Sequence, residues 1–514
     1  MSSAGYDLST SNRTDGCLIT AESFAEAQKC VRHAWEIAHA GNESGSPYQV
    51  QYARSQYRNL MTLAIAAYGV AVDLGYGPEL PDDVPGAHAR TMEALGGGFG
   101  VSGCWFVHDD CAAYVPIIAP SGASRDLIFI HPAARAKSRH IQEAAFSYSC
   151  AVSCGISVNR VLLLSVNREF VRGQAIDPNS IFLVDDMTAV IPGIAATIMR
   201  RTETLRAALA QPVASIPSCD RAYSCPVCSQ YLPPLPRHNV FTLYRGSELS
   251  RRLFREGITD LVDLAPGSRN AGGTALSERQ LMQIESVRTG SPVINRNRLE
   301  PFLAALEYPL AFLDFETYSV ALPPFQGLRP WQHVPFQFSL HVKRSREATP
   351  SHVSFIEPAG QDGREALLTQ FLSSIPPTGS IVVFGSNFER AMLMALGDAF
   401  PQSSEAVRGA VDRVVDLSQP FQSFWYYHPE QRGKLSLKAI LPALTGKSYS
   451  ALAISDGLDA SMRYYVSSHR SKDIDSPLSY DVVAQIRHDL EEYCGMDTQA
   501  LVDILEVLER SVNG

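Results

Sequence analysis

The spacing of hydrophobic residues changes along the chain from a helical to a strand-like pattern. Over residues 19–40 apolar positions recur at helical spacing, with Thr20 as the expected N-cap, and a second long helix is predicted over 52–74. A further helical stretch covers 141–154. Short apolar runs of strand length lie at 104–107, 113–118, 127–130 and 160–166. Together these patterns predict a mixed α/β region with a small sheet.

The middle of the chain differs, because proline, arginine and glycine punctuate residues 229–300. Here we expect mostly helices, including a helix, a glycine turn and a second helix over 253–261, and a flexible loop over 267–273. Strands and helices alternate again further along. The predicted strands are 311–315, 337–342, 381–384 and 414–417, and the predicted helices are 364–373, 388–396, 437–444 and 482–509. This alternation predicts a second α/β region of mixed strand direction.

Three parts follow from these patterns: an α/β domain at 17–235, a helical connector at 236–305 and a second α/β domain at 306–514. A polar lead-in over residues 1–16 is expected to be disordered. A chain of 514 residues is too long for one ordinary core, so an α/β multidomain protein is the expected fold class.

Composition and charge narrow the function classes. The chain is 45% hydrophobic and 19% charged, has no apolar run long enough to cross a bilayer, and lacks a secretory signal, so we expect a cytoplasmic protein with no membrane partner. The net charge of −9 argues against nucleic-acid binding by the whole surface, although a local basic groove is compatible with it.

Two short motifs carry the candidate chemistry. Asp314 and Glu316 follow the apolar run 308–312, and residues two apart on a strand point to the same face. Tyr493 and Asp497 lie four apart in the predicted C-terminal helix, so they also share a face. A strand and a helix would therefore each present a pair of functional groups.

The residue types suit phosphodiester hydrolysis. Mg²⁺ and Mn²⁺ prefer carboxylate oxygens, and two such ions ~3.5–4 Å apart activate a water and stabilise the leaving oxygen. A fourth carboxylate should come from the middle of this domain. Glu389 is expected in the first helical turn after strand 381–384, where it can face the edge of the sheet.

With these motifs, residues 306–514 resemble the DEDD exonucleases of the ribonuclease-H-like fold, in their tyrosine subtype. Asp314 and Glu316 match the first motif, 387–389 the second, and Tyr493 with Asp497 the third. The second motif departs from the family, because most such enzymes have Asp where this chain has a glutamate.

This resemblance implies two Mg²⁺ or Mn²⁺ ions and a tyrosine that orients the attacking water or helps to deprotonate it. The implied metal ligands are Asp314, Glu316, Glu389 and Asp497, the implied tyrosine is Tyr493, and the candidate substrate-binding residues are Thr317 and Asn387.

Segments 313–317, 329–341 and 436–442 are also similar to a bacterial family, the domain of unknown function 2779. Members look like fusions of an N-terminal RecB-like nuclease domain with an exonuclease-like domain. The resemblance extends over nearly the whole chain, and it implies a RecB-like fold for residues 17–235.

Four of the ten cysteines form a candidate metal centre: Cys30, Cys219, Cys225 and Cys228. RecB-like nucleases of the CRISPR-adaptation kind carry a 4Fe–4S cluster with one cysteine from the first helix and three after the core. The resemblance therefore implies a 4Fe–4S cluster here. Four thiolates suit zinc as well, and the distal spacing is the reverse of the more usual one.

The catalytic core of a RecB-like domain would need Asp on one strand and Glu-x-Lys on the next. This chain has Pro116, Phe129 and His131 at those positions, and Ser147 where a glutamine is usual. Because Pro and Phe cannot bind Mg²⁺, the resemblance implies a domain that keeps its fold and cluster but has lost its cleavage site.

Several other residues can be interpreted as having either a functional role or an ordinary structural or surface role. Asp416 either supports the metal ligands or caps a helix, and Cys494 is expected to be a packed helix residue rather than a nucleophile. His428 and Lys438 either touch phosphate or are solvated surface residues, with the solvated role as the default.

The sequence thus predicts a metal-dependent 3′–5′ exonuclease acting on single-stranded DNA or RNA ends. Aromatic stacking on Phe315, Tyr318 or Trp331 is expected to hold the terminal bases. The alternative is a non-catalytic nucleic-acid-binding scaffold with a structural iron–sulfur cluster.

Overall fold

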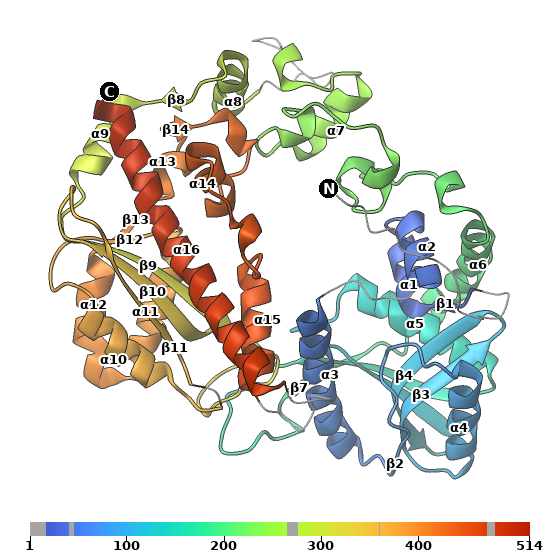
Figure 1. The fold of residues 1–514 in the computed structure, drawn as a ribbon. Helices are drawn as coiled ribbons and strands as arrows, with labels where there is room; N and C mark the ends of the chain where they lie inside the picture. The colour runs from blue at the N-terminus through green and yellow to red at the C-terminus, as the bar shows by residue number, and fades with distance from the viewer. Residues whose placement is uncertain (1–16, 41–45, 265–275, 359, 470–477, 514) are drawn as a thin grey trace. The chain divides into compact units, whose positions relative to one another are not determined.

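The computed structural model describes residues 17–40, 46–264, 276–358, 360–469 and 478–513. The predicted lead-in and the predicted loop at 267–273 lie outside these residues. Contacts between residues divide the chain into two compact units, which Figure 1 shows as a ribbon. We call them the N-terminal unit (Met1–Ser46, Ala53–Pro233 and Val320–Gln332) and the C-terminal unit (Pro47–Tyr52, Pro234–Ser319 and His333–Gly514).

A mixed seven-stranded sheet forms the centre of the N-terminal unit, and six of its strands run in the order β2-β3-β4-β5-β6-β7, with β1 paired to β4. The four predicted strands of this region are confirmed, each within a longer observed strand. The strands are β1 (Ile19–Thr20), β2 (Val72–Asp73), β3 (Val101–His108), β4 (Cys111–Ser121), β5 (Ser124–Ile130), β6 (Val158–Val166) and β7 (Phe182–Asp186).

Both faces of this sheet are covered. On β5, Leu127 and Phe129 pack into one hydrophobic core and Ile128 and Ile130 into another, because successive strand residues point to opposite faces. Burial on both faces explains why these strands appear in the sequence as uninterrupted apolar runs. The helices are α1 (Ala21–Ala27), α2 (Val31–Ala40), α3 (Pro47–Tyr68), α4 (Val84–Gly96), α5 (Ser138–Ser153) and α6 (Ile191–Leu209).

Two helix predictions in this region need correction. The stretch 19–40 is two helices rather than one, although the N-cap at Thr20 is confirmed by a capping box with Ser23. The helix predicted over 52–74 is α3, which begins at Pro47 and ends at Tyr68. Gly69 follows with a φ of 59°, a left-handed conformation that glycine adopts readily and that ends the helix.

The C-terminal unit contains a five-stranded sheet in the order β11-β10-β9-β12-β13. β11, β10 and β9 run antiparallel, while β12 and β13 run parallel to β9, so the predicted mixed strand direction is confirmed. The strands are β9 (Leu310–Tyr318), β10 (Val334–Lys343), β11 (Ser351–Ile356), β12 (Ile381–Val383) and β13 (Val414–Asp416).

Helices cover both faces of this sheet as well. α10 and α11 pack on one face through a shared hydrophobic core, and the long α16 contacts β9 and β10 on the other, as Figure 1 shows in red. The helices are α10 (Arg364–Ser374), α11 (Ser386–Ala399), α12 (Ser404–Asp412), α13 (Gln419–Gln422), α14 (Leu437–Thr445), α15 (Gly457–Ser468) and α16 (Tyr480–Asn513).

The segment predicted as a connector contains α7 (Ser247–Arg255), α8 (Glu278–Thr289) and α9 (Arg296–Ala304). It is tied to the C-terminal unit by pairing of β8 (Val293–Ile294) with β14 (Tyr426–Tyr427). The predicted helix–glycine turn–helix at 253–261 is partly wrong, because only a short 3-10 turn follows Gly257. That the connector is a domain of its own stays a prediction. None of the described helices is both long and apolar enough to cross a membrane.

Candidate functional site

The central strand of the C-terminal sheet, β9, presents two carboxylates on one face. Asp314 lies opposite Ser339 and Glu316 opposite Gln337 on β10. The alternate residues Leu313 and Phe315 pack into the core beneath α10 and α11. Because strand residues alternate between faces, this packing turns both carboxylates toward the opposite face.

Helix α16 closes that opposite face. The Cys494 Sγ lies 3.6 Å from Asp314 Oδ2, and the donor atoms of Asp314, Glu316 and Cys494 all lie within 4.8 Å of one another. One turn further along α16, Thr498 bonds the Ser339 hydroxyl at 2.7 Å, which fixes the helix against β10. The predicted strand and the predicted helix therefore meet at these side chains.

Asp497 and Tyr493 face the same cluster from α16 and are nearly inaccessible to solvent, with 7% and 3% of their surface exposed. Asp497 lies outside the tightest donor set, but its charge acts on both Asp314 and Glu316. The Tyr449 hydroxyl donates a hydrogen bond to its carboxylate at 2.6 Å.

The electrostatics of this cluster disfavour several negative charges at once. Burial raises the pKa of Asp314 well above its usual range, and repulsion from Asp497, Glu316 and Glu389 raises it further. Burial and then Asp497 likewise raise the pKa of Glu316. The pKa of Asp497 is raised to about 6 by burial, although Tyr449 and nearby cationic charge oppose the shift. A bound cation would relieve this repulsion, because it favours the charged form of each group.

Glu389 lies in the first turn of α11, as predicted, with only 4% of its surface exposed. Burial, and then the charge of Asp416, raise the pKa of Glu389 to about 7. Its Oε2 atom is buried and has no hydrogen-bond partner among the described residues. A buried carboxylate oxygen without a partner is costly unless a proton or a cation neutralises it. Glu389 lies outside the tightest donor set, although its charge reaches Asp314.

The two predicted substrate-binding residues lie beside these carboxylates in the sequence. The Thr317 hydroxyl bonds the His333 ring at 2.9 Å, and His333 packs edge-on against Phe388 with ring centroids 5.4 Å apart. Asn387 is exposed at the start of α11. Their part in substrate binding stays a prediction.

The sequence missed one residue of this site and left a second with two interpretations. Tyr449 is 48 positions from Asp497, so no local spacing indicates their hydrogen bond. Lys438, at the start of α14, is only partly exposed, and its Nζ lies 4.7 Å from the centroid of the Tyr493 ring and bonds Ser455 O at 2.6 Å. The expected solvated role of Lys438 is therefore wrong, because α14 packs against α16 and turns this cation inward.

Three of the residues with two interpretations have structural roles. The Asp416 carboxylate accepts hydrogen bonds from the backbone N–H groups of Gly385, Ser386 and Ser418, so it caps the start of α11. His428 accepts from a backbone N–H in a short turn. Cys494 is fully buried, and burial followed by the charge of Asp314 raises the pKa of its thiol well above the usual range, which suits a packed residue and not a nucleophile.

The predicted base stacking is wrong for two of the three aromatics. Phe315 and Tyr318 expose 4% and 1% of their surface, because they pack inside the C-terminal unit. Trp331 belongs to the N-terminal unit, where it is partly buried against the core that contains Leu60 and Ile117.

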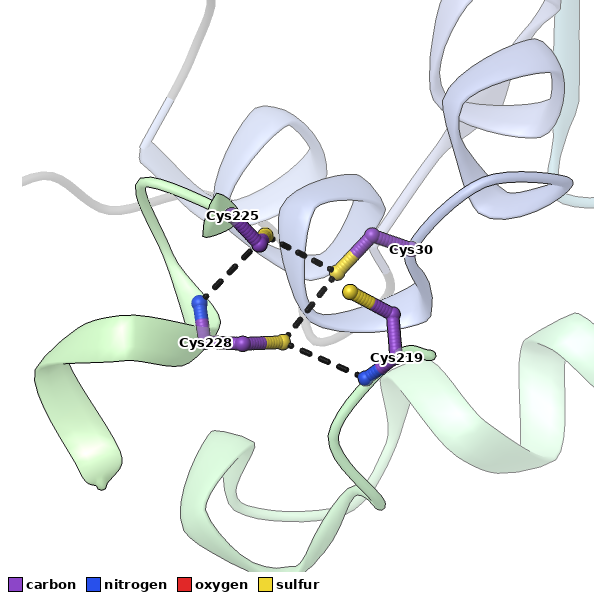
Figure 2. Close-up of side chains that lie close together, drawn as sticks. All are labelled: Cys30, Cys219, Cys225 and Cys228. Carbon is purple, nitrogen blue, oxygen red and sulfur yellow. Dashed lines mark hydrogen bonds between the residues drawn. The ribbon is translucent and has the colours of Figure 1, made fainter. Parts of the chain in front are cut away.

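The four cysteines of the candidate metal centre, all in the N-terminal unit, come together, and Figure 2 shows them. The Cys30 Sγ lies 3.4 Å from that of Cys228 and 3.7 Å from that of Cys225, and all four sulfur atoms lie within 4.8 Å of one another. Cys30 stands at the break between α1 and α2. The other three come from the segment that contains two short 3-10 turns, the second of which begins at Cys228. This arrangement can bind a metal.

The surroundings of the cysteines shift the pKa values of their thiols in opposite directions. Burial raises the pKa of Cys30, and it acts in the same direction on Cys225. At Cys225, however, backbone N–H groups of Cys228 and Val227, together with the thiols of two neighbouring cysteines, outweigh burial and lower the pKa. Arg32 holds the loop to α2, because its Nε donates to Ile216 O at 2.6 Å.

At the positions that would carry a RecB-like cleavage site, Pro116, Phe129 and Ser147 are buried in the sheet and in α5. His131 stacks on His140 with ring centroids 4.0 Å apart. Burial, and then the neighbouring His140 and Arg139, lower the pKa of His131 to about 3, so this ring is neutral at physiological pH.

A domain of unknown function, DUF2779, spans residues 311–436. The matched segment runs from β9 to the residue before α14. It includes Asp314, Glu316 and Glu389, and it ends before Tyr449 and Asp497. No curated protein matches the sequence.

Proposed function

We propose that the C-terminal unit is a metal-dependent 3′–5′ exonuclease that hydrolyses phosphodiester bonds at single-stranded ends. One observation carries the proposal: Asp314 and Glu316 on β9 meet Asp497 on α16 in a buried cluster whose pKa values are raised by burial and mutual repulsion. Perturbed acids of this kind concentrate at functional sites. The order of motifs along the chain, which resembles the DEDD exonucleases, supports the same reaction.

In this proposal two Mg²⁺ or Mn²⁺ ions bind at the cluster, and Asp314, Glu316, Glu389 and Asp497 would hold them. When bound, such ions supply an activated water and charge relief at the leaving oxygen. The Oε2 of Glu389, buried and without a hydrogen-bond partner among the described residues, would be neutralised by such a cation. Its longer side chain would replace the more usual aspartate.

The remaining residues of the site would position water and phosphate. Burial, and then Asp497, raise the pKa of Tyr493, so its hydroxyl stays protonated and orients the attacking water without taking its proton. Tyr449 holds the carboxylate of Asp497 in place through its hydrogen bond. The ammonium of Lys438, beside the Tyr493 ring, would pair with an oxygen of the scissile phosphate.

We further propose that the cysteine centre holds a 4Fe–4S cluster, with zinc as the other candidate. The N-terminal unit would then contribute nucleic-acid binding and no cleavage, since Pro116 and Phe129 offer no metal ligand.

A second function is favoured by one observation. The tightest donor set includes the Cys494 thiol, and hard cations prefer oxygen to sulfur. This favours a non-catalytic nucleic-acid-binding scaffold whose C-terminal site has lost its metals.

A digestion time course tests the exonuclease against the scaffold. Single-stranded DNA and RNA labelled at the 5′ end are incubated with Mn²⁺ and either wild type or Asp314→Ala. A labelled ladder that shortens progressively, and is lost in the variant, supports a 3′–5′ exonuclease with one cleavage site. Cutting that persists in Asp314→Ala would place activity in the N-terminal unit, and binding without shortening would favour the scaffold.

A further inference from the structure

Two loops of the C-terminal unit meet at a glycine. A Cβ on Gly433 would lie 2.1 Å from Thr242 O, so only glycine permits this approach. The Gly433 N–H donates to the Tyr427 hydroxyl at 2.9 Å, which ties the second loop to β14. The loop around Thr242 is thereby held against the loop that precedes α14.

These loops rest on a stack of buried aromatic rings. Tyr244 contacts Phe424 edge-on with ring centroids 4.9 Å apart, and Phe424 stacks on Tyr427 at the same distance. All three rings are at least nine-tenths buried. A rigid base of this kind fixes the positions of the side chains above it.

Four exposed cations project from this base, and we call them the basic patch: Arg245, Arg279, Arg432 and Lys434. The Arg245 guanidinium lies over the Tyr244 ring at 5.4 Å, and Arg279 lies over Phe424 at 5.8 Å.

Within the part of the chain that the structure describes, no member of the basic patch forms an ion pair. The nearby carboxylate of Glu430 is already engaged by Arg237 and lies 3.6 Å from His238. In a chain of net charge −9, four unneutralised cations at one place are a local exception. Their charge is available for a ligand.

Backbone strain is concentrated at the same place. Six described residues other than glycine have a positive φ, and four of them lie in these two loops or at their aromatic base: Arg245 at 48°, Ser247 at 30°, Phe424 at 54° and Arg432 at 46°. Residues other than glycine rarely adopt a positive φ. Where they do, they cluster at ligand-binding and catalytic sites. Two of these four residues, Arg245 and Arg432, belong to the basic patch.

The basic patch leads toward the carboxylates. Lys434 precedes Lys438 by four residues, a separation of at most ~14 Å along an extended chain. Lys438 in turn lies over the Tyr493 ring at the edge of the cluster. A flexible polyanion whose end lies at the carboxylates can therefore also reach the basic patch.

We propose that the basic patch binds the sugar–phosphate backbone of a single nucleic-acid strand, a few nucleotides behind the 3′ end held at the carboxylate cluster. This assignment rests on the proposed function for its direction and its end. Guanidinium groups match phosphate oxygens in geometry and charge, and three of the four cations are arginines. The patch contacts no base edge in this arrangement, so it grips DNA and RNA strands of any sequence.

Two of the arginines allow a variant that keeps the fold. Arg245→Gly and Arg432→Gly each remove a charge at a position where glycine suits the backbone better than arginine. With Lys434→Ala they make a triple variant that lacks three positive charges. The matched control removes three exposed arginines elsewhere in the same unit, Arg298→Ala, Arg408→Ala and Arg510→Ala.

Binding is measured in EDTA by fluorescence anisotropy of labelled oligo(dT) and oligo(U) over a range of KCl concentrations. Each phosphate contact on a single strand contributes about 0.7 to the slope of log affinity against log salt, so the triple variant should lose about 2 from the slope. The control should keep the wild-type slope. An unchanged slope in the triple variant, or equal losses in variant and control, would overturn the assignment.

Two further readouts separate the possible failures. Competition by polyglutamate at the same concentration of charge would reassign the patch to an acidic protein and overturn the nucleic-acid proposal. Digestion with Mn²⁺ is scored separately. If the strand binds through the patch but wild type does not shorten it, the proposed exonuclease is wrong and the patch stands. If wild type shortens the strand and the triple variant binds equally well, the patch is wrong and the exonuclease stands.

Discussion

Replacing Glu389 with glutamine should stabilise the metal-free protein at high pH. The pKa of this carboxyl is about 7 in the folded chain, against 4.5 for an exposed glutamate, because burial and then Asp416 disfavour its charged form. A raised acid pKa means that folding favours the protonated group. The full stability is therefore present below pH 4.5 and is lost as the pH rises through about 7.

The size of this loss follows from the pKa difference. Each unit of difference between the folded and unfolded pKa is worth ~1.4 kcal/mol, so ionisation of Glu389 costs about 3 kcal/mol at pH 8. Glu389→Gln removes that cost without a change in shape. The expected gain in Tm at pH 8 is roughly 6–12 °C for a domain of this size, with almost none at pH 4.5.

The assay is thermal unfolding in EDTA at both pH values. Glu405→Gln is the matched control, because Glu405 is an exposed glutamate in the first turn of the neighbouring helix α12. Saturating Mn²⁺ should abolish the advantage of Glu389→Gln, since a cation would neutralise the wild-type carboxylate. Equal Tm changes at pH 8 and pH 4.5, or a gain in Glu405→Gln as large as that in Glu389→Gln, would refute the reasoning.

Three further predictions concern single residues. Tyr449→Phe deletes the hydrogen bond to Asp497 and should raise the Mn²⁺ concentration needed for half-maximal activity about tenfold. The stability cost should be ~1–2 kcal/mol. An unchanged Mn²⁺ titration would contradict the assigned role. Cys225→Ser should lower the amount of iron or zinc bound per chain, as measured by elemental analysis. Cys154→Ser, which lies outside the cluster, should leave that amount unchanged. Equal metal contents in both variants would count against the centre. Asp416→Ala leaves two backbone N–H groups at the start of α11, and that of Ser418 before α13, without their acceptor and should cost ~2 kcal/mol in urea unfolding. A loss below ~0.5 kcal/mol would show that water replaces the cap.

Much of the C-terminal sheet could be predicted because its local and tertiary patterns agree. On β9 the core-facing residues Leu313 and Phe315 alternate with Asp314 and Glu316, so the face that carries the acids follows from strand geometry. The same alternation shows why base stacking on Phe315 was a wrong expectation. A residue next to a catalytic motif on a buried strand points away from the site.

The missing parts of the site depend on contacts between distant segments. Nothing near Tyr449 in the sequence indicates that α16 will place Asp497 within reach of its hydroxyl. Lys438 has the sequence context of a solvated helix start, and only the packing of α14 on α16 turns it inward. The strained conformations of Arg245 and Arg432 are equally invisible, because arginine gives no sign of a positive φ.

The most direct test of the central claim compares two conservative aspartate variants in the digestion of 5′-labelled single strands with Mn²⁺. Asp314→Asn keeps the shape of the residue at the centre of the cluster, and Asp412→Asn makes the same change at an exposed position on α12. We predict that wild type and Asp412→Asn shorten the strand from its 3′ end at the same rate, while Asp314→Asn retains binding and loses shortening by at least a factor of about 100, the scale of removing one electrostatic catalytic group. Equal shortening by Asp314→Asn and wild type would contradict the account.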